Sequence, residues 1–338
     1  MGFLKKLRCT ALLLGFLALP ATAGQGEQIT ATDFLPHKAT TEKSNETWSY
    51  QFVFDNGTKA FMNIAELYVP GSGRKLGCDL SVWNFKGKSY SVGRQYPPER
   101  LKTGSSPAQI SIKGEYVLTG LPSKGHRVFF TANKGGDFLL DLTFDSAVKG
   151  LKLPGGAAKI GSESYTQFLH IPYGRVSGKL AINGDTVQVK GRAMMDHSIQ
   201  TAQATDLARR VITFFQNSQS EAFAARLGIS KSGELFGYAV KLEGGKPQLV
   251  TATEITDDGA KYTGEKFPKG TLEIKWSDGS STSFSVAKVQ EKFSMLNNFD
   301  GWLAKKAAKV MMGGEPFFYR GRSKTAEGKT VDWSVMGL

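Results

Sequence analysis

The sequence predicts an all-β protein made of two consecutive antiparallel β-barrels, with one short helix near the C-terminus. Three observations lead to this fold class. Apolar and polar residues alternate over short runs along most of the chain, as they do in strands with one buried face. Asn-Gly pairs, which are typical of tight hairpin turns, join two pairs of these runs. Apolar residues recur at helical spacing in a single late segment.

The first half of the chain contains one strong hairpin signal. Trp48–Phe54 and Thr58–Val69 both alternate, and Asp55-Asn56-Gly57 joins them. Gly, Pro and Lys residues separate three further strand-like runs, which are Ala108–Leu118, His126–Thr131 and Asp137–Phe144.

A change of composition marks the expected domain boundary. Ser146–Glu163 contains a proline, four glycines and no aromatic residue, which is typical of a linker or a long crossover. We therefore expect an N-terminal β domain over residues 24–150 and a C-terminal β domain over residues 151–338.

The second half repeats the pattern of short strands. Arg175–Ile182 and Thr186–Ala193 flank Asn183-Gly184-Asp185, a second hairpin signal. Later runs follow at the spacing of about 8–12 residues that antiparallel sandwiches and barrels show. They are Arg210–Asn217, Glu221–Ile229, Leu235–Leu242, Leu249–Thr256, Thr271–Trp276 and Thr282–Val289.

The expected helix starts at a capping Asn298 and ends at Gly313. Its apolar residues recur at helical spacing, and three lysines share the opposite face. The favoured interpretation is a helix that covers a barrel end, and the alternative is a basic amphipathic helix on a membrane surface. The apolar residues are Phe299, Trp302, Leu303, Ala307 and Val310, and the lysines are Lys305, Lys306 and Lys309.

Residues 1–23 are typical of a cleavable signal peptide. Basic residues precede the short apolar run Ala11–Pro20, and Ala21-Thr22-Ala23 forms a small-residue cleavage site. The run is too short to span a membrane comfortably, because spanning takes roughly 20 apolar residues. We expect a mature chain that starts at Gly24 and is periplasmic or secreted, by a bacterial or a eukaryotic route. Its single cysteine, Cys78, permits no intrachain disulfide.

The composition is that of a globular protein, with 40% hydrophobic and 22% charged residues. The net charge of +13 favours anionic partners, and contact with an anionic membrane surface is one such expectation. Nucleic acid is not expected as a partner, because the lysines are scattered and export removes the usual target. The oligomeric state is left open.

Common catalytic and metal-binding signatures are absent from the sequence. There is no G-x-S-x-G elbow and no H-E-x-x-H motif. The four histidines, His37, His126, His170 and His197, are far apart in the chain. With one mature cysteine, this predicts no metal site and no cofactor. Cys78 is expected to be a buried, unreactive thiol.

The stretch Tyr165–Thr201 contains a specific motif. Its order, V-S-G-x-L-x-I-N-G and then V-x-V-x-G-x-A-x-x-D-H, resembles the two-barrel lipocalin-like superfamily. That group includes the carotenoid 1,2-hydratases, AttH-like bacterial proteins and the yeast survival-factor lipid carriers. The matching positions are Val176, Ser177, Gly178, Leu180, Asn183, Gly184, Gly191, Ala193, Asp196 and His197.

This resemblance implies two lipocalin-like (calycin) barrels and an apolar ligand. In the hydratases an acidic residue protonates an isolated double bond, and Asp196 is the matching proton donor here. The sequence departs from the pattern after the Asp-His pair, where Ser198, Ile199 and Gln200 replace an aromatic residue and a glycine. Methionine stands where an aromatic residue usually precedes the pair. The departures weaken the hydratase inference more than the fold inference.

Alternation along Thr186–His197 predicts where the pair points. Val187, Val189, Gly191 and Ala193 share one face, so Met195 and His197 continue into the barrel and Asp196 points outward. His197 is then a candidate ligand-binding group or a satisfied core histidine, and Asp196 a catalytic acid or a structural carboxylate.

Further candidate ligand-binding residues are Met195, Arg210, Phe214 and Tyr238. An inward arginine would bind an anionic headgroup, and aromatic side chains would line a calyx. Their alternative roles are solubility on the outer face for arginine and ordinary core packing for the rings.

Three functions are compatible with these features. The main prediction is an exported protein that binds or carries an apolar small molecule such as a lipid, fatty acid or isoprenoid. The alternative is a cofactor-independent hydratase or cyclase, a carotenoid 1,2-hydratase-like lyase, with Asp196 as proton donor. The third is an adhesive surface protein with one continuous basic face.

Overall fold

The computed structural model describes residues 26–69, 73–122, 125–133, 136–216, 220–256, 270–298, 302–311 and 314–337. Most of these residues belong to antiparallel strands, which confirms the predicted all-β fold class. The expected signal peptide at residues 1–23 lies outside the described residues.

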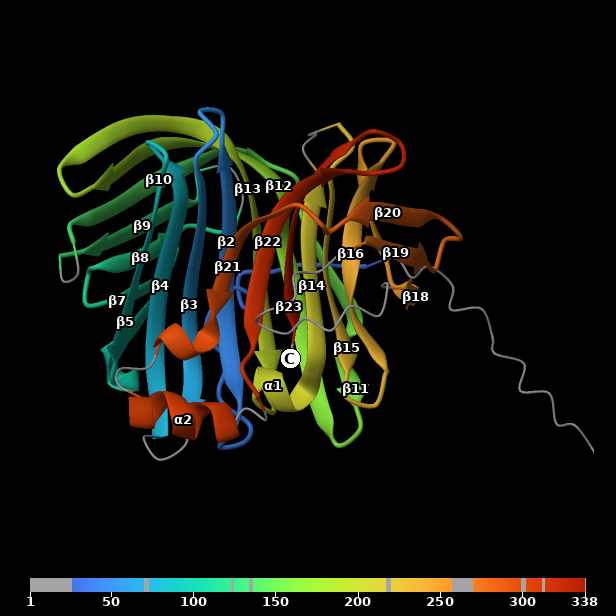
Figure 1. Cartoon of the computed structure of the whole chain (residues 1–338), viewed down its shortest axis with the longest axis horizontal. Coiled ribbons are helices and arrows are strands. Elements are labelled where there is room, and N and C mark those ends of the chain that lie inside the picture. The colour runs from blue at the N-terminus through green and yellow to red at the C-terminus, as the bar shows by residue number, and fades with distance from the viewer. Residues whose placement is uncertain are drawn as a thin grey trace, which may run out of the picture.

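The larger sheet has the strand order β5-β4-β3-β2-β13-β12-β10-β9-β8-β7-β6, with β11 and β1 added beside β12. It curls into a half-barrel (Figure 1). Its strands are β1 Glu27–Gln28, β2 Asn45–Phe54, β3 Lys59–Val69, β4 Gly73–Phe85, β5 Lys88–Tyr96, β6 Leu101–Ser105, β7 Ala108–Ile112, β8 Tyr116–Thr119, β9 Arg127–Ala132, β10 Phe138–Ala147, β11 Leu151–Ile160, β12 Glu163–Ile182 and β13 Asp185–Gln200.

A second sheet has the order β17-β16-β15-β14-β23-β22-β21, and a small third sheet has the order β18-β19-β20. Figure 1 shows the second sheet beside the first. The strands are β14 Ala208–Gln216, β15 Phe223–Ser230, β16 Leu235–Glu243, β17 Lys246–Val250, β18 Ala252–Thr256, β19 Thr271–Trp276, β20 Ser281–Ser285, β21 Val289–Ser294, β22 Phe317–Lys324 and β23 Thr330–Gly337. Two short 3₁₀ segments are Pro98–Arg100 and Met295–Asn298.

Both predicted Asn-Gly hairpins form. Gly57 has φ +84° between β2 and β3, and Gly184 has φ +87° between β12 and β13. These values lie in the left-handed region that glycine enters without a steric penalty, which explains why the turns occur at these residues. The run predicted as one strand over Ala108–Leu118 is instead the pair β7 and β8.

The linker expected at Ser146–Glu163 was a wrong prediction, because β11 occupies most of it. Pro154 and the two glycines after it coincide with a register shift between Lys152 and Ala157, so the unusual composition marks an irregular strand. β12 and β13 follow this segment and pair with β10 and β2 of the larger sheet. The division of the chain into domains at residue 150 stays a prediction.

Four groups of buried side chains lie in and between these sheets, and the smallest of them surrounds Tyr165 and Phe236. One fills the concave side of the larger sheet, and a second lies between the second and third sheets. The third lies where the two larger sheets meet, and it includes Val53, Leu169, Met194, Phe215 and Tyr238. We call the place where these sheets meet the sheet junction. Cys78 is buried on the concave side, and burial raises the pKa of its thiol.

Helix α2, Trp302–Met311, forms within the predicted helical segment, and a second short helix, α1, spans Ala204–Leu207. Trp302 is 69% exposed and Val310 is 75% exposed, so these two apolar residues do not cover a barrel end. Phe299 and Gly313, expected at the helix ends, lie outside the described residues. Among the helices in the described part of the chain, none is long and apolar enough to cross a membrane.

Candidate functional site

Strand β13 places Asp196 and His197 on opposite faces of the larger sheet, as the alternation predicts. On the concave face, the imidazole of His197 stacks on the indole of Trp48, with ring centroids 4.5 Å apart. On the convex face, Asp196 forms an ion pair with Arg226 of β15, in the second sheet. Both residues are almost completely buried. The motif therefore contributes to two separate environments.

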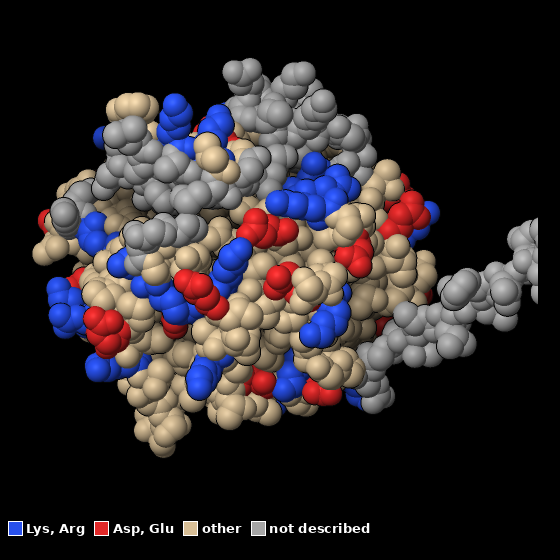
Figure 2. Space-filling view, turned by 90° about the horizontal axis from the view of Figure 1, so that it is seen from below, with Lys and Arg blue, Asp and Glu red and all other residues tan. Residues whose placement is uncertain are grey.

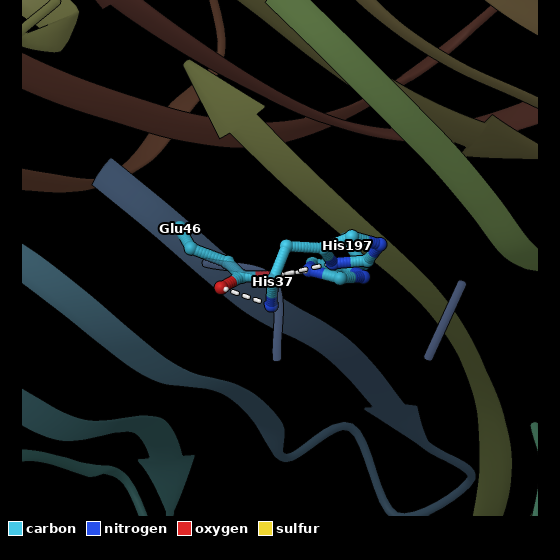
Figure 3. Close-up of side chains that lie close together, drawn as sticks. All are labelled: His37, Glu46 and His197. Carbon is cyan, nitrogen blue, oxygen red and sulfur yellow. Dashed lines mark hydrogen bonds and ion pairs between the residues drawn. The ribbon is translucent and has the colours of Figure 1, made fainter. Parts of the chain in front are cut away.

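The concave side holds a hydrogen-bonded cluster of His37, Glu46 and His197 (Figure 3). Nε2 of His197 and Nδ1 of His37 lie 2.8 and 2.9 Å from Oε1 of Glu46. The backbone N–H of His37 also donates to the Glu46 carboxylate, at 3.0 Å. Nδ1 of His197 donates to the backbone carbonyl of Asp33 at 2.8 Å. Every one of these contacts converges on Glu46 or His197.

Proton positions in this cluster follow from the partners. A carbonyl oxygen only accepts, so Nδ1 of His197 carries a proton, and a further proton lies between Nε2 and Glu46. Burial acts to raise the pKa of Glu46, but the hydrogen bonds from His197 and His37 outweigh it and hold that pKa below its usual value. Glu46 is therefore an ionised anchor for the two histidines.

The chain before β2 covers this cluster. Phe34 is fully buried, and its carbonyl accepts a hydrogen bond from the Trp48 indole at 2.9 Å. The Phe34 ring meets His126 and His170 edge-on, with centroids 5.7 and 5.9 Å away. Polar and aromatic contacts thus hold Phe34, with its neighbours Asp33 and His37, against the concave face.

All four histidines of the chain gather here, although they are far apart in the sequence. Burial lowers the pKa of His126 to about 4, and its Nε2 lies 2.9 Å from the hydroxyl of Tyr50. Sequence reasoning missed His37, His170, His126 and Glu46 as members of one site. No local pattern identifies them, because the pairing of β2 with β13 and the covering segment bring them together.

The same cluster offers a set of possible metal ligands. One atom each from His37, Glu46 and His197 lie within 4.8 Å of one another, a spacing that a divalent cation with nitrogen and oxygen ligands can bridge. In the structure these atoms are already joined to each other by hydrogen bonds. The absence of a metal and of a cofactor stays a prediction.

The convex side of β13 places polar groups at the sheet junction. Oδ2 of Asp196 lies 3.2 Å from NH1 of Arg226, whose Nε donates to the Tyr165 hydroxyl at 3.1 Å. Within the described residues, Asp196 Oδ2 and both amide atoms of Gln167 are buried without a hydrogen-bond partner. Burial raises the pKa of Asp196 more than Arg226 and His197 lower it. This carboxyl group is therefore easier to protonate than a free aspartate.

A row of polar residues extends from Asp196 across the convex face. The strand register pairs Asp196 with Ser49, Ser49 with Asn63, and Asn63 with Asp79. The Ser49 hydroxyl donates to Asn63 at 3.1 Å, and burial raises the pKa of Asp79 to about 6. Two carboxyl groups with raised pKa values thus share one face.

The remaining sequence-predicted ligand residues lie in different places. Met195 is buried in the concave core, and Phe214 packs in the core of the second sheet. Tyr238 is at the sheet junction, where its hydroxyl contacts Leu151 O, Gln167 O and Leu169 N. Arg210 lies buried on β14. The structure does not bring these four side chains together with His197, and their ligand-binding role stays a prediction.

No family model and no curated protein matches the sequence. Solved structures do match. An AttH-like protein from Nitrosomonas europaea has a TM-score of 0.61 at 12% identity, over 94% of this chain and 99% of that one. CghA in complex with Sch210972 has a TM-score of 0.56 at 12% identity, over 94% and 95%. Kievitone hydratase from Nectria haematococca has a TM-score of 0.50 at 12% identity, over 92% and 96%.

Likeness at such low identity is evidence about the fold. It extends over nearly the whole of each chain, and it agrees with the motif found at Tyr165–Thr201. The protein therefore shares the lipocalin-like β fold of these solved structures.

Proposed function

We propose that this protein catalyses a hydratase- or cyclase-type reaction on an apolar small molecule with an isolated carbon–carbon double bond. Asp196 is the proton donor. The observation that carries the proposal is the buried Asp196 carboxyl at the sheet junction. Within the described residues its Oδ2 has an ion pair with Arg226 but no hydrogen bond, and the Gln167 amide on the neighbouring strand is unpartnered. Two proteins of the same fold support it, since one is named a hydratase and another was solved with a small molecule.

The chemistry follows from the environment of the carboxyl group. Asp196 transfers its proton to one carbon of the double bond, and the other carbon becomes a carbocation. In hydration, water adds its oxygen there and returns one proton to Asp196. In cyclisation, a second double bond of the substrate attacks and a proton is lost to the carboxylate. Arg226, 3.2 Å away, stabilises the carboxylate after proton transfer, and the Tyr165 ring offers a cation-stabilising face.

Binding or carriage of an apolar molecule without turnover is the second candidate. The Arg226–Asp196 ion pair favours it, because a cation beside the carboxylate stabilises the form that cannot donate a proton. A continuous basic face, which the adhesive alternative requires, receives no support from the coloured residues of Figure 2, where Lys and Arg are interspersed with Asp and Glu.

Turnover in isotopically labelled water separates the two candidates. Farnesol, geranylgeraniol and squalene are incubated with the protein in H₂¹⁸O or D₂O, and products are analysed by mass spectrometry. Hydration incorporates one ¹⁸O, and cyclisation in D₂O incorporates one deuterium. Asp196→Asn is expected to lower turnover at least about 100-fold while bound substrate is retained, because an amide cannot deliver the proton.

Asp141→Asn is the matched control, since Asp141 also pairs with an arginine, Arg127 at 2.8 Å, but is partly exposed on β10. It should keep wild-type turnover. Substrate that binds equally to both variants and to the wild type, with no product in any of them, would support carriage instead.

We also propose export, from the signal-peptide pattern at residues 1–23. N-terminal sequencing of protein from its own host should give Gly24 as the first residue. Retention of Met1 in a membrane fraction would contradict this.

A further inference from the structure

We propose that the sheet junction contains a binding site for one small monovalent anion, such as chloride, enclosed by Lys59, Trp83 and Arg320. This site is separate from Asp196 and serves to hold the two sheets together. Five strands contribute its polar lining: β2, β3, β4, β22 and β23.

The site is a small cavity between the two sheets. Its polar and charged lining comes from Lys59, Trp83, Arg320 and Asp332, with Gln51 beside them. Its volume of about 20 Å³ exceeds the roughly 10–15 Å³ that one water needs, so it fits a single small ion or one to two waters. It is too small for the apolar substrate proposed above. The remaining lining residues are Phe52, Val53, Ala60, Phe215, Gly321 and Trp333.

The charges around the cavity do not balance. Asp332 is shared by three cations: Lys59 Nζ at 2.9 Å, Arg192 NH2 at 3.1 Å and Arg322 Nε at 2.8 Å. Arg320 pairs with Glu291 at 2.7 Å. Four cationic side chains therefore face two carboxylates. Burial lowers the pKa of Lys59, the bond to Asp332 opposes this, and the nearby Arg322 and Arg192 add to the lowering.

Two residues of the lining also have donors without acceptors. In the described part of the chain, Trp83 Nε1 and Arg320 Nε are buried and have no hydrogen-bond partner. Arg320 is only 6% exposed, and its guanidinium lies 4.4 Å above the Phe61 ring centroid and 5.4 Å from that of Trp83. These aromatic contacts fix the guanidinium in place. A buried donor needs an acceptor, because leaving it unpaired is costly.

An anion meets both requirements at once. It accepts hydrogen bonds from the indole and guanidinium N–H groups, and it compensates the excess positive charge. Water would supply acceptors but no charge, and a cation would be repelled by Lys59 and Arg320. Because Lys59 and Trp83 belong to the larger sheet and Arg320 to the second sheet, a bound anion links the two.

Thermal unfolding of the full chain tests the proposal. Chloride or bromide replaces gluconate, which is too bulky for the cavity, at constant ionic strength. We expect a saturable rise in Tm of about 3–6 °C in either halide at high occupancy. Bromide in crystals should give an anomalous peak in the cavity, beside Trp83 Nε1 and Arg320 Nε.

Variants locate the effect. Arg320→Met should abolish the halide dependence, and Trp83→Phe, which keeps a ring but removes the N–H donor, should raise the half-saturating chloride concentration about tenfold. Trp83→Phe keeps the test valid if Arg320→Met does not fold. Arg127→Met is the matched control, since this exposed arginine also has a carboxylate partner and lies over a ring, that of Phe129. An equal Tm in gluconate, or a cavity that contains only water in bromide crystals, would overturn the proposal.

Discussion

The two faces of strand β13 bury neighbouring residues in opposite electrostatic environments. On the concave face, Glu46 accepts hydrogen bonds from His37 and His197, and its pKa falls although it is buried. On the convex face, Oδ2 of Asp196 has an ion pair with Arg226 but no hydrogen bond, and the pKa of Asp196 rises. Burial is common to both carboxyl groups. The difference indicates that the hydrogen-bond donors aimed at a buried carboxylate decide the direction in which its pKa shifts.

The largest expected change in stability comes from removing the concave anchor. Glu46→Gln should lower the free energy of unfolding by about 2–4 kcal/mol at pH 7, because charge-assisted hydrogen bonds from two histidines are lost. Urea unfolding measures it. Glu66→Gln is the control, since Glu66 pairs with Arg74 in a partly exposed position, and it should cost less than about 1 kcal/mol. Equal losses of unfolding free energy in both variants would show that the hydrogen bonds to Glu46 stabilise the fold no more than a partly exposed ion pair does.

A smaller effect is expected at the sheet junction. Tyr238→Phe should cost about 1–2 kcal/mol, because the buried Tyr238 hydroxyl accepts a hydrogen bond from Leu169 N–H and donates one to a backbone carbonyl, and both are lost. Tyr90→Phe, at a partly buried tyrosine that packs between Phe85 and Phe138, should change stability by less than about 0.5 kcal/mol. A Tyr238→Phe protein as stable as the wild type would mean that water replaces the hydroxyl.

The smallest effect, and the sharpest contrast between the two faces, is in the sign of the pH dependence. Glu46 has a lowered pKa in the folded state. Its contribution to the free energy of unfolding is therefore present at pH values above its unfolded-state pKa of 4.5, and it is lost as the pH falls through its folded-state pKa. Asp196 has a raised pKa in the folded state. Its contribution to the free energy of unfolding is therefore largest at pH values below its unfolded-state pKa of 3.8, and it is lost as the pH rises through its folded-state pKa.

Unfolding free energies between pH 3 and pH 7 check this. The difference in unfolding free energy between the wild type and Glu46→Gln should become smaller on acidification. For Asp196→Asn, acidification should shift the difference in favour of the wild type. If the difference in unfolding free energy from the wild type changed with pH in the same direction for both variants, the assignment of opposite environments would be contradicted.

Much of the fold could be predicted because its signals are local. The Asn-Gly turns at Gly57 and Gly184 fix two hairpins, and the resemblance carried by the motif at Tyr165–Thr201 predicted the β fold that the solved structures share. Strand β11 was misread as a linker, since Pro154 and its glycines are rare inside strands and are tolerated here only at a register shift. Export, the domain division at residue 150 and the ligand roles of Met195, Arg210, Phe214 and Tyr238 remain predictions.

The sequence by itself determined which side of the sheet Asp196 and His197 face, because the two-residue period of a strand is a local property of the backbone. Tertiary structure alone decided what each of them meets. The pairing of β13 with β2 places Glu46 near His197, and the segment before β2 adds Asp33 and His37. The packing of β15 against the larger sheet brings Arg226 to Asp196. Contacts between residues more than a hundred positions apart, or between different sheets, depend on the whole fold, so no spacing along the chain encodes them.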